Sequence, residues 1–295
     1  MHTHKTDTDM VMHWQTTRFD LDLSHPKVMG IVNLTPDSFS DGGLHGDTLQ
    51  ALRHAEQLLR DGAGILDVGG ESTRPGALVV PFKEELLRLT PFLQEAVRWQ
   101  VPISVDTCKP EVMQVVLDIG VDIINDIWAF RQPGAERVIA AHPNCGVCLM
   151  HMHRDPQTMQ VETMTGDVLR EVTDFLKERS ESLTSKGIAA RRLMLDPGIG
   201  FGKTVVQNFQ LLAKQAELLH LGYPLLVGWS RKSSLGAVLA HDGLTPEPAQ
   251  RQVASVAAAL LAVERGAAVV RVHDVKQTVD ALKVWQAMEK AEFDL

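Results

Sequence analysis

The sequence predicts an α/β protein, a closed (β/α)8 barrel (TIM barrel) with an N-terminal β-hairpin that covers the closed end. Three observations lead to this fold class. Short runs that are apolar on both faces recur along the chain, as in strands buried in a parallel sheet, and helical patterns separate them. The length of 295 residues suits eight β/α units. The first run lacks the glycine-rich turn that opens a doubly wound dinucleotide-binding sheet.

The elements follow in a simple order along the chain. Residues 1–12 are polar and are expected to be flexible, and residues 13–295 are predicted to form one domain. Apolar and polar residues alternate between 14 and 23, which predicts the hairpin. The eight predicted strands are 28–34, 65–70, 103–107, 123–127, 146–152, 193–198, 225–230 and 269–275.

Helical spacing appears between the strands, where apolar residues recur on one face of the predicted helix. One set lies early in the chain and one late: Ala51, Leu52, Ala55, Leu58 and Leu59, then Ala249, Val253, Val256, Ala257, Leu260 and Leu261. Strands and helices therefore alternate, as a parallel barrel requires.

Composition indicates a soluble globular protein, with 44% apolar and 22% charged residues. The net charge of -8 argues against a nucleic-acid partner. No apolar stretch approaches the ~20 residues of a membrane span, and the N-terminus has no apolar signal core, so we expect a cytoplasmic protein without a membrane partner. Three cysteines suit a reducing compartment, where we expect free thiols.

One segment, Cys145 to His153, contains ligand types that suit zinc. Much of it is predicted to be a strand, in which successive side chains point to opposite faces, so Cys148 and His151 should diverge. A buried thiol with histidines at the rim is therefore the favoured interpretation.

Two long loops, 35–43 and 71–77, follow predicted strand ends, where barrel enzymes place their chemistry. Ordinary surface loops would have a similar Gly, Pro and Ser content. Polar residues within two positions of other strand ends favour the functional interpretation, although a single Asp there can be a helix cap. They are Asn33, Asp106, Asn125, Asp196, Lys232, Arg271 and His273.

These residues form two chemical sets. Asp106, Asn125 and Asp196 suit the donor-rich edge of a flat aminopyrimidinone, because a carboxylate accepts two parallel N–H bonds. Lys232, Arg271 and charged His273 suit an oxyanion such as pyrophosphate. The glycine run 196–203 lacks the spacing of a nucleotide phosphate loop, so we interpret it as a tight turn that lets Phe201 approach a flat ligand.

Seven motifs, in order from about Val28 to Val275, together resemble the dihydropteroate synthase family. They are Met29–Gly43, Asp67–Gly76, Ile103–Thr107, Asn125–Asp126, Asp196–Lys203, Gly228–Ser233 and Arg271–Val275. The resemblance implies a transferase of folate biosynthesis, a pterin-binding homodimer that uses Mg²⁺ and is a target of sulfonamides. Its small-molecule substrates would be 4-aminobenzoate and a dihydropterin pyrophosphate, joined with release of pyrophosphate.

The resemblance also implies roles for individual residues. The pterin contacts would be Asp106, Asn125, Met150, Asp196, Phe201, Gly228 and Lys232. The pyrophosphate contacts would be Asn33, Arg74, Arg271 and His273, with Asn33 the direct metal ligand. The aminobenzoate contacts would be Phe39, Thr73, Pro75, Ser230 and Ser233. Asn33, Asp106, Lys232, Arg271 and His273 would form the catalytic set.

Two other functions share part of this pattern. A methyltransferase module that presents a methylated folate to a corrinoid partner would share the acidic pterin pocket but would not need Lys232, Arg271 and His273 as a pyrophosphate site. A catalytically silent paralogue would be expected to lack residues such as Asn33 or Arg74, and both are present. The departures from the family pattern, at Cys108, Ile199 and Trp229, remove none of the predicted donors or acceptors.

Overall fold

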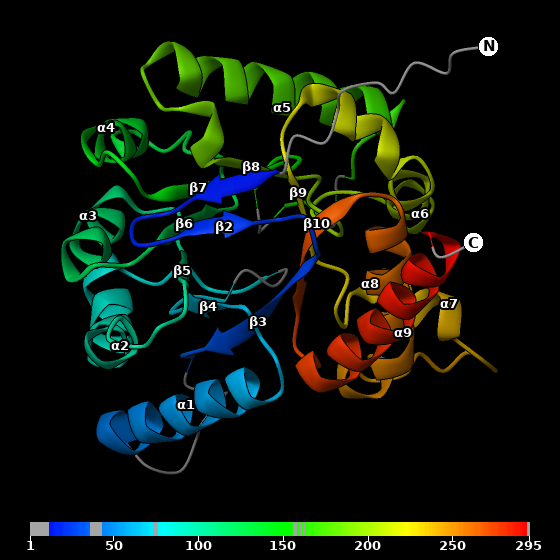
Figure 1. Ribbon diagram of the computed structural model, residues 1–295, viewed down its shortest axis with the longest axis horizontal. Helices are drawn as coiled ribbons and strands as arrows, with labels where there is room; N and C mark the ends of the chain where they lie inside the picture. The colour runs from blue at the N-terminus through cyan, green and yellow to red at the C-terminus, as the bar shows by residue number, and fades with distance from the viewer. Residues whose placement is uncertain are drawn as a thin grey trace.

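Eight parallel strands close into a barrel in this computed structural model, in which residues 12–35, 43–72, 76–155, 158–159, 161 and 163–293 are described (Figure 1). Around the barrel the order is β10-β3-β4-β5-β6-β7-β8-β9, so each strand neighbours the next in sequence. The strands are β3 (Lys27–Asn33), β4 (Ile65–Gly69), β5 (Ile103–Asp106), β6 (Ile123–Asp126), β7 (Gly146–Met150), β8 (Leu193–Asp196), β9 (Leu225–Val227) and β10 (Ala267–Val272). The predicted fold class is confirmed.

The helices lie outside the barrel and alternate with its strands (Figure 1). They are α1 (Gly43–Arg60), α2 (Phe82–Ala96), α3 (Pro110–Ile119), α4 (Ala135–Ala141), α5 (Val168–Ser185), α6 (Val205–Ala213), α7 (Ser233–Leu239), α8 (Gln252–Glu264) and α9 (Val275–Phe293). Short 3₁₀ turns occupy Ala190–Arg192, Gln215–Leu221 and Pro248–Arg251. None of the helices in the described ranges combines the length and apolar character that crossing a membrane would demand.

All eight predicted strands extended too far at their C-terminal ends. The largest errors are in β10, which ends at Val272 and not at Val275, and in β9, which ends at Val227 and not at Ser230. After it the chain turns, because Lys232 N–H donates to Trp229 O at 3.1 Å and Arg231 takes a left-handed φ of 61°. Ser230 and Lys232 therefore lie beyond the ladder, in the loop after β9, whereas Asn33, Asp106 and Asp196 remain paired as the last residues of their strands.

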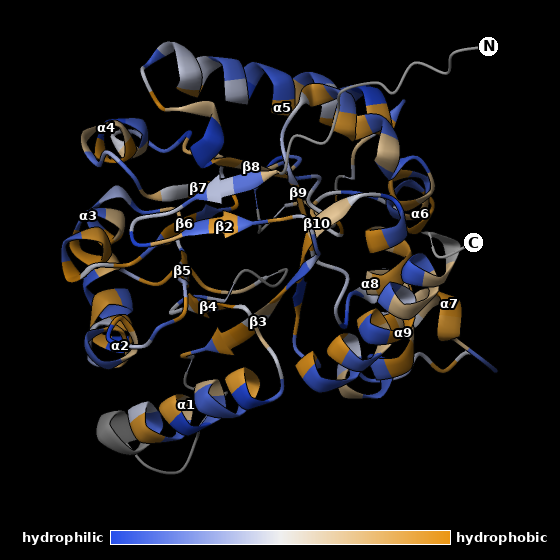
Figure 2. Cartoon of the chain, in the orientation of Figure 1, coloured by the Kyte–Doolittle hydropathy of each residue, from blue (hydrophilic) through white to orange (hydrophobic). Residues whose placement is uncertain are grey.

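Helix α8 presents the predicted apolar face away from the barrel. Val253 is 82% exposed and Leu261 is 41% exposed, whereas Ala258 and Ala262 are buried. The spacing predicted which residues share a face, but not which face packs on the strands. Elsewhere the pattern is conventional: in Figure 2 apolar residues colour β3, while α1 and α5 show alternating apolar and hydrophilic stripes.

The N-terminal hairpin closes the amino end of the barrel. It consists of β1 (His13–Gln15) and β2 (Asp20–Asp22), paired antiparallel. Trp14 is fully buried among apolar side chains of the barrel interior such as Met29, and its indole N–H donates to Arg192 O at 2.8 Å. The predicted hairpin that covers the closed end is thus present, and the opposite end of the barrel remains available for ligands.

Candidate active site

The predicted polar residues gather at the carboxyl rim of the barrel. The structure places them as follows: Asn33 ends β3, Asp106 ends β5, Asn125 lies one residue before the end of β6, Asp196 ends β8, Lys232 precedes α7, Arg271 lies one residue before the end of β10 and His273 follows it. In parallel strands these ends share one face of the barrel. Arg74 and the aminobenzoate candidates Phe39, Thr73 and Pro75 lie outside the described residues.

A network of charges links β4, β5 and β10. Arg271 Nε donates to Asp67 Oδ2 at 2.6 Å, and Arg271 Nη2 donates to Asp106 Oδ2 at 3.0 Å. Asp67 also accepts from Ser104 Oγ at 2.5 Å and from Asn125 Nδ2 at 3.2 Å. The predicted acceptor set and the predicted cationic set are therefore in direct contact, and Arg271 holds a fixed position between two carboxylates.

Sequence reasoning did not identify Asp67 as a site residue. Its carboxylate is fully buried in the middle of β4, in a run that otherwise contains Ile65, Leu66 and Val68. A charge buried in a barrel strand requires a partner, and this requirement was the available signal. The partner, Arg271, lies 204 residues further along the chain.

Burial changes the protonation of the rim. It raises the pKa of Asp196 to about 6, although a 2.7 Å hydrogen bond from Gly198 N–H and the charge of Lys232 act in the opposite direction. Burial also raises the pKa of Asp106, with Arg271 opposing the change and Asp67 adding to it. The pKa of Lys232 is lowered to about 8 by burial, against the attraction of Asp196. A ligand that hydrogen-bonds to the charged forms would reverse these shifts.

The run 196–203 forms the predicted tight turn between β8 and α6. Gly198 has a φ of 67°, and a Cβ atom there would lie 1.8 Å from His151 O, so only glycine fits. The turn brings Phe201 beneath Lys232, whose Nζ lies 4.3 Å from the ring centroid. Met150, at the end of β7, is buried in the same small apolar cluster as Phe201. The cluster offers an apolar surface beside the carboxylates.

Loops β9–α7 and β10–α9 are joined by two side-chain contacts. Ser230 Oγ lies 3.0 Å from His273 Nδ1 and accepts from His273 N–H at 3.1 Å. Behind this pair, Arg231 Nη2 donates to Asp274 Oδ1 at 2.8 Å. Ser230 was predicted on the aminobenzoate side and His273 on the pyrophosphate side, so the structure brings the two predicted subsites into contact.

The remaining predicted site residues within the described ranges are Ser233 and Gly228. Ser233 is exposed at the first position of α7. Gly228 directly follows β9, and a Cβ atom there would lie 3.8 Å from Arg271 Cβ.

The three cysteines are free. Cys148 packs in the barrel interior, whereas the His151 ring stacks edge-on against Phe175 at 5.0 Å, so the two side chains diverge as expected.

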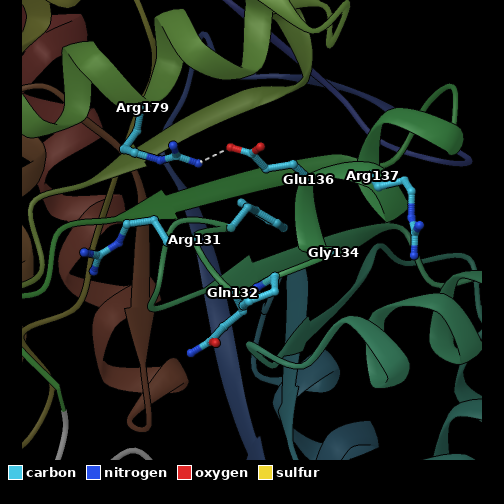
Figure 3. A pocket seen from close by; sticks show the side chains of 8 residues that line it. Arg131, Gln132, Gly134, Glu136, Arg137 and Arg179 are labelled. Atoms are coloured by element: carbon cyan, nitrogen blue, oxygen red, sulfur yellow. Dashed lines mark hydrogen bonds and ion pairs between the residues drawn. The ribbon is translucent and has the colours of Figure 1, made fainter.

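Two cavities lie outside the cluster formed by Asp106, Asn125, Asp196 and Arg271. One of about 590 Å³ is lined by residues after β4, β5 and β6, including Cys108 and Trp128. The other, of about 350 Å³, lies near α4 and α5. There Arg179 pairs with Glu136 at 2.8 Å, while Arg131 and Arg137 point to opposite sides (Figure 3). Since these cations do not converge, the second cavity offers no single anion site.

The model of the family described as "Pterin binding enzyme" matches residues 29–273, which includes all eight barrel strands in whole or in part. The chain belongs to this family. Among the pterin binding enzymes, the dihydropteroate synthase of Neisseria meningitidis serogroup C is 50% identical over 278 residues, covering 93% of this chain and 97% of the relative. The dihydropteroate synthase of Escherichia coli strain K12 is 48% identical over 273 residues, covering 92% and 95%.

Solved structures of pterin binding enzymes agree. Xanthomonas albilineans dihydropteroate synthase with 4-aminobenzoic acid superimposes with a TM-score of 0.88 at 47% identity, covering 95% of this chain and 99% of that one. Burkholderia cenocepacia dihydropteroate synthase complexed with 7,8-dihydropteroate gives 0.86 at 48% identity, covering 96% and 98%. A sulfonamide complex of the Yersinia pestis enzyme gives 0.87 at 45% identity, covering 95% and 100%. The resemblance to dihydropteroate synthases is thereby confirmed.

Proposed function

We propose that the chain condenses 4-aminobenzoate with 6-hydroxymethyl-dihydropterin pyrophosphate, giving dihydropteroate and pyrophosphate, with Mg²⁺ as cofactor. The observation that carries the proposal is the rim itself. Buried acceptors, Asp196 and Asn125, lie on the same rim as fixed cations, Arg271 and Lys232. A flat heterocycle with several N–H donors and a polyphosphate tail matches both halves of this arrangement.

The pterin would bind between the carboxylates and the apolar cluster. The Asp196 carboxylate accepts the paired N–H donors of the aminopyrimidinone edge, since its geometry suits two parallel hydrogen bonds. Asp106 and Asn125 bind further polar groups of the ring system. Phe201 and Met150 contact the ring itself. Binding at Asp196 favours the ionised carboxylate and so offsets the effect of its burial.

The leaving group would bind at the cationic side of the rim. Arg271 is held by Asp67 and Asp106, so its charge is in place before the substrate arrives. His273 is oriented by Ser230, and its charged form would donate to an oxyanion. Arg74 is proposed as a further contact on the basis of the family resemblance. Fixed donors stabilise charge that develops in the transition state without further reorganisation.

Asn33 fits a sparse magnesium site. Its amide oxygen is a hard donor at the rim, and a Cβ atom on Gly69 would lie 3.9 Å from it. Within the described ranges no three His, Cys, Asp or Glu side chains form a group that could hold a metal ion, and Arg271 already engages the carboxylates of Asp67 and Asp106. Mg²⁺ commonly takes few protein ligands and completes its shell with water and phosphate oxygens, so Asn33 with the pyrophosphate is sufficient. The bound ion would neutralise charge on the leaving pyrophosphate.

The chemistry is then electrostatic and positional. The bond between the pterin methylene carbon and the pyrophosphate oxygen breaks, and its electron pair leaves with the oxygen. The amine nitrogen of 4-aminobenzoate forms the new bond to that carbon and releases a proton. Arg271 and His273 stabilise the leaving oxyanion while the pterin pocket holds the carbon in line with the amine. No covalent nucleophile is required.

The aminobenzoate would lie against Ser230 and Ser233, together with Phe39, Thr73 and Pro75, where sulfonamides would compete.

We further propose a cytoplasmic homodimer. Apolar side chains are exposed on α7 and α8, where Val238 is 63% exposed and Val253 is 82% exposed. Two copies that pack these helices together would bury this surface. Light scattering of the purified protein tests the mass of the assembly.

A coupled assay for pyrophosphate release tests the function. We expect release only when the dihydropterin pyrophosphate, 4-aminobenzoate and Mg²⁺ are all present, and a sulfonamide should compete with 4-aminobenzoate. Turnover of a methylated folate with a corrinoid, and none with the arylamine, would contradict the proposal. A protein that binds pterins without any turnover would instead indicate the silent paralogue.

A further inference from the structure

Lys203 is a buried cation to which the steps above give no role. It is the last residue of the 196–203 glycine turn and is only 3% exposed. Its Nζ donates to Gly198 O at 2.8 Å, to Phe201 O at 3.2 Å and to His151 O at 3.4 Å. Two of these carbonyls belong to the turn after β8 and the third to the segment after β7, so the ammonium joins two loops.

The position is costly for a charged group. The three hydrogen-bond acceptors are neutral carbonyls, and among the described residues no carboxylate forms an ion pair with Lys203 within 4 Å. Burial lowers the pKa of Lys203 to about 7, against the attraction of Asp196 and with a further decrease from Lys232. The neighbouring His151 stays neutral, because burial and the charge of Lys203 lower its pKa to about 2. Burying an ammonium in this way does not stabilise a fold by itself.

The two loops approach each other unusually closely. A Cβ atom at Gly198 would lie 1.8 Å from His151 O, and one at Gly202 would lie 2.6 Å from His153 Cβ. This approach brings the partial negative charges of three carbonyl oxygens together. A cation among them offsets their repulsion, much as a bound monovalent ion would.

The same two loops carry residues of the pterin pocket. Asp196 ends β8, Phe201 lies within the turn, and Met150 is the last residue of β7. Because Lys203 binds the backbone on both sides, a shift of one loop relative to the other would change the width of the pocket at the ring. Its positive charge also favours the ionised form of Asp196.

We propose that Lys203 is a positioning residue of the pterin pocket, an internal cation that fixes the Asp196–Phe201 turn against the end of β7 and supports the charge of Asp196. The inference rests on the proposed function, because it assumes that these residues contact a pterin. It does not make Lys203 a catalytic residue, since the ammonium reaches backbone carbonyls and not the ligand.

Chemical rescue tests the cation directly. In the full-length protein, Lys203→Ala removes the ammonium and leaves space for a small amine. Calorimetric titration with 6-hydroxymethylpterin at neutral pH should show binding that is weaker by about tenfold or more. Ethylammonium or propylammonium should restore much of this affinity, whereas Na⁺ and tetramethylammonium, which lack N–H donors, should not. Lys214→Ala, at an exposed lysine near the end of the following helix, is the matched control and should bind as the unaltered protein does.

A second variant guards against a folding defect. Lys203→Gln keeps a long side chain with N–H donors but removes the charge. The pH below which pterin affinity falls should move upward in this variant, because Asp196 keeps only Lys232 and Arg271 as nearby cations. A purely structural lysine would not move this pH, and melting temperatures of each variant report the loss of stability separately.

These measurements distinguish the proposed function from the proposed role of Lys203. Binding of the pterin by the unaltered protein tests the proposed function before any variant is made. Given that binding, rescue of Lys203→Ala by an alkylammonium ion, or an upward pH shift in Lys203→Gln, supports the inference. Unchanged affinity in both variants, or a loss of affinity with neither rescue nor a pH shift, would overturn it.

Discussion

Buried carboxylates at the two ends of the barrel differ in the donors that surround them. At the closed end, Asp122 is fully buried and accepts hydrogen bonds from Arg18 N–H, Nε and Nη2 at 3.1, 3.0 and 2.5 Å, and from Ile103 N–H at 2.9 Å. At the open end, Asp67 and Asp106 share one guanidinium, that of Arg271. Asp196 accepts from Gly198 N–H, and its pKa is raised by burial.

This difference distinguishes stability from function. A carboxylate with four donors is satisfied within the fold, and nothing is gained by adding a ligand. Asp196 is buried with fewer donors, in an unfavourable state that a ligand with N–H groups relieves. We therefore expect substitutions at the closed end to reduce stability and leave pterin binding intact. Substitutions at the open end should weaken pterin binding and leave the fold intact.

The largest expected effect is at the closed end. Arg18→Met removes the guanidinium and leaves the Asp122 charge buried without its main partner, which costs about 3 to 5 kcal/mol of unfolding free energy. Urea denaturation measures it. Arg191→Met, at an exposed arginine on the same end that donates to Gln15, should change stability by less than about 0.5 kcal/mol. Equal losses in both variants would show that the Asp122 contacts are not special.

The second effect is at the open end. Asp196→Asn replaces a paired acceptor with an amide that presents one mismatched donor, so pterin affinity should fall by about 2 to 4 kcal/mol. The fold should remain intact. Calorimetric titration with a pterin measures the loss, and Asp118→Asn, at an exposed helical position, is the control. Unchanged affinity in Asp196→Asn would remove Asp196 from the pocket.

The third effect divides the open end into its two halves. His273→Ala should lower turnover by about 100-fold, as expected for the loss of one oxyanion donor, while a pterin without pyrophosphate binds almost as before. Steady-state kinetics and titration on the same preparation measure both quantities. His220→Ala, at an exposed histidine, should leave both unchanged. Parallel losses in turnover and pterin binding would instead place His273 in the pterin pocket or in the fold.

Much of the fold could be predicted from the sequence, because a buried parallel strand requires a continuous apolar run and each run is short. The strand ends could not be predicted, since Ser230 continues an apolar run whose backbone has already turned. For α8, residues on both faces are small or apolar, so the spacing alone could not show that Val253 faces outward.

The gathering of polar residues at the rim was predictable where they end apolar runs, as Asp106 and Asp196 do. Asp67 was not predicted as a site residue because it lies within an apolar run. Its ion-pair partner, Arg271, belongs to a strand that is distant in sequence. The role proposed for Lys203 depends on the approach of two loops that are separate in sequence. Such contacts arise from packing, which local sequence patterns do not encode.

The pH dependence of pterin affinity reports the charge of Asp196 in the folded protein, on which the proposed pterin pocket depends. With a pKa of about 6 in the unliganded protein, Asp196 is protonated below that pH and loses its acceptor pair. Affinity should therefore fall by about tenfold per pH unit below 6, or about 1.4 kcal/mol. It should fall again at higher pH as Lys203, with a pKa of about 7, and Lys232, with a pKa of about 8, lose their protons.

The contribution of Asp196 to the stability of the unliganded protein should change with pH in the opposite direction to pterin affinity. Asp196 keeps its proton to a higher pH when folded than when unfolded, so its contribution to stability falls as pH rises from about 4 to about 6. This contribution is the difference between the unaltered protein and Asp196→Asn. We expect pterin affinity to rise across this window while that contribution falls. A pterin affinity that is flat from pH 4 to 7 would contradict it.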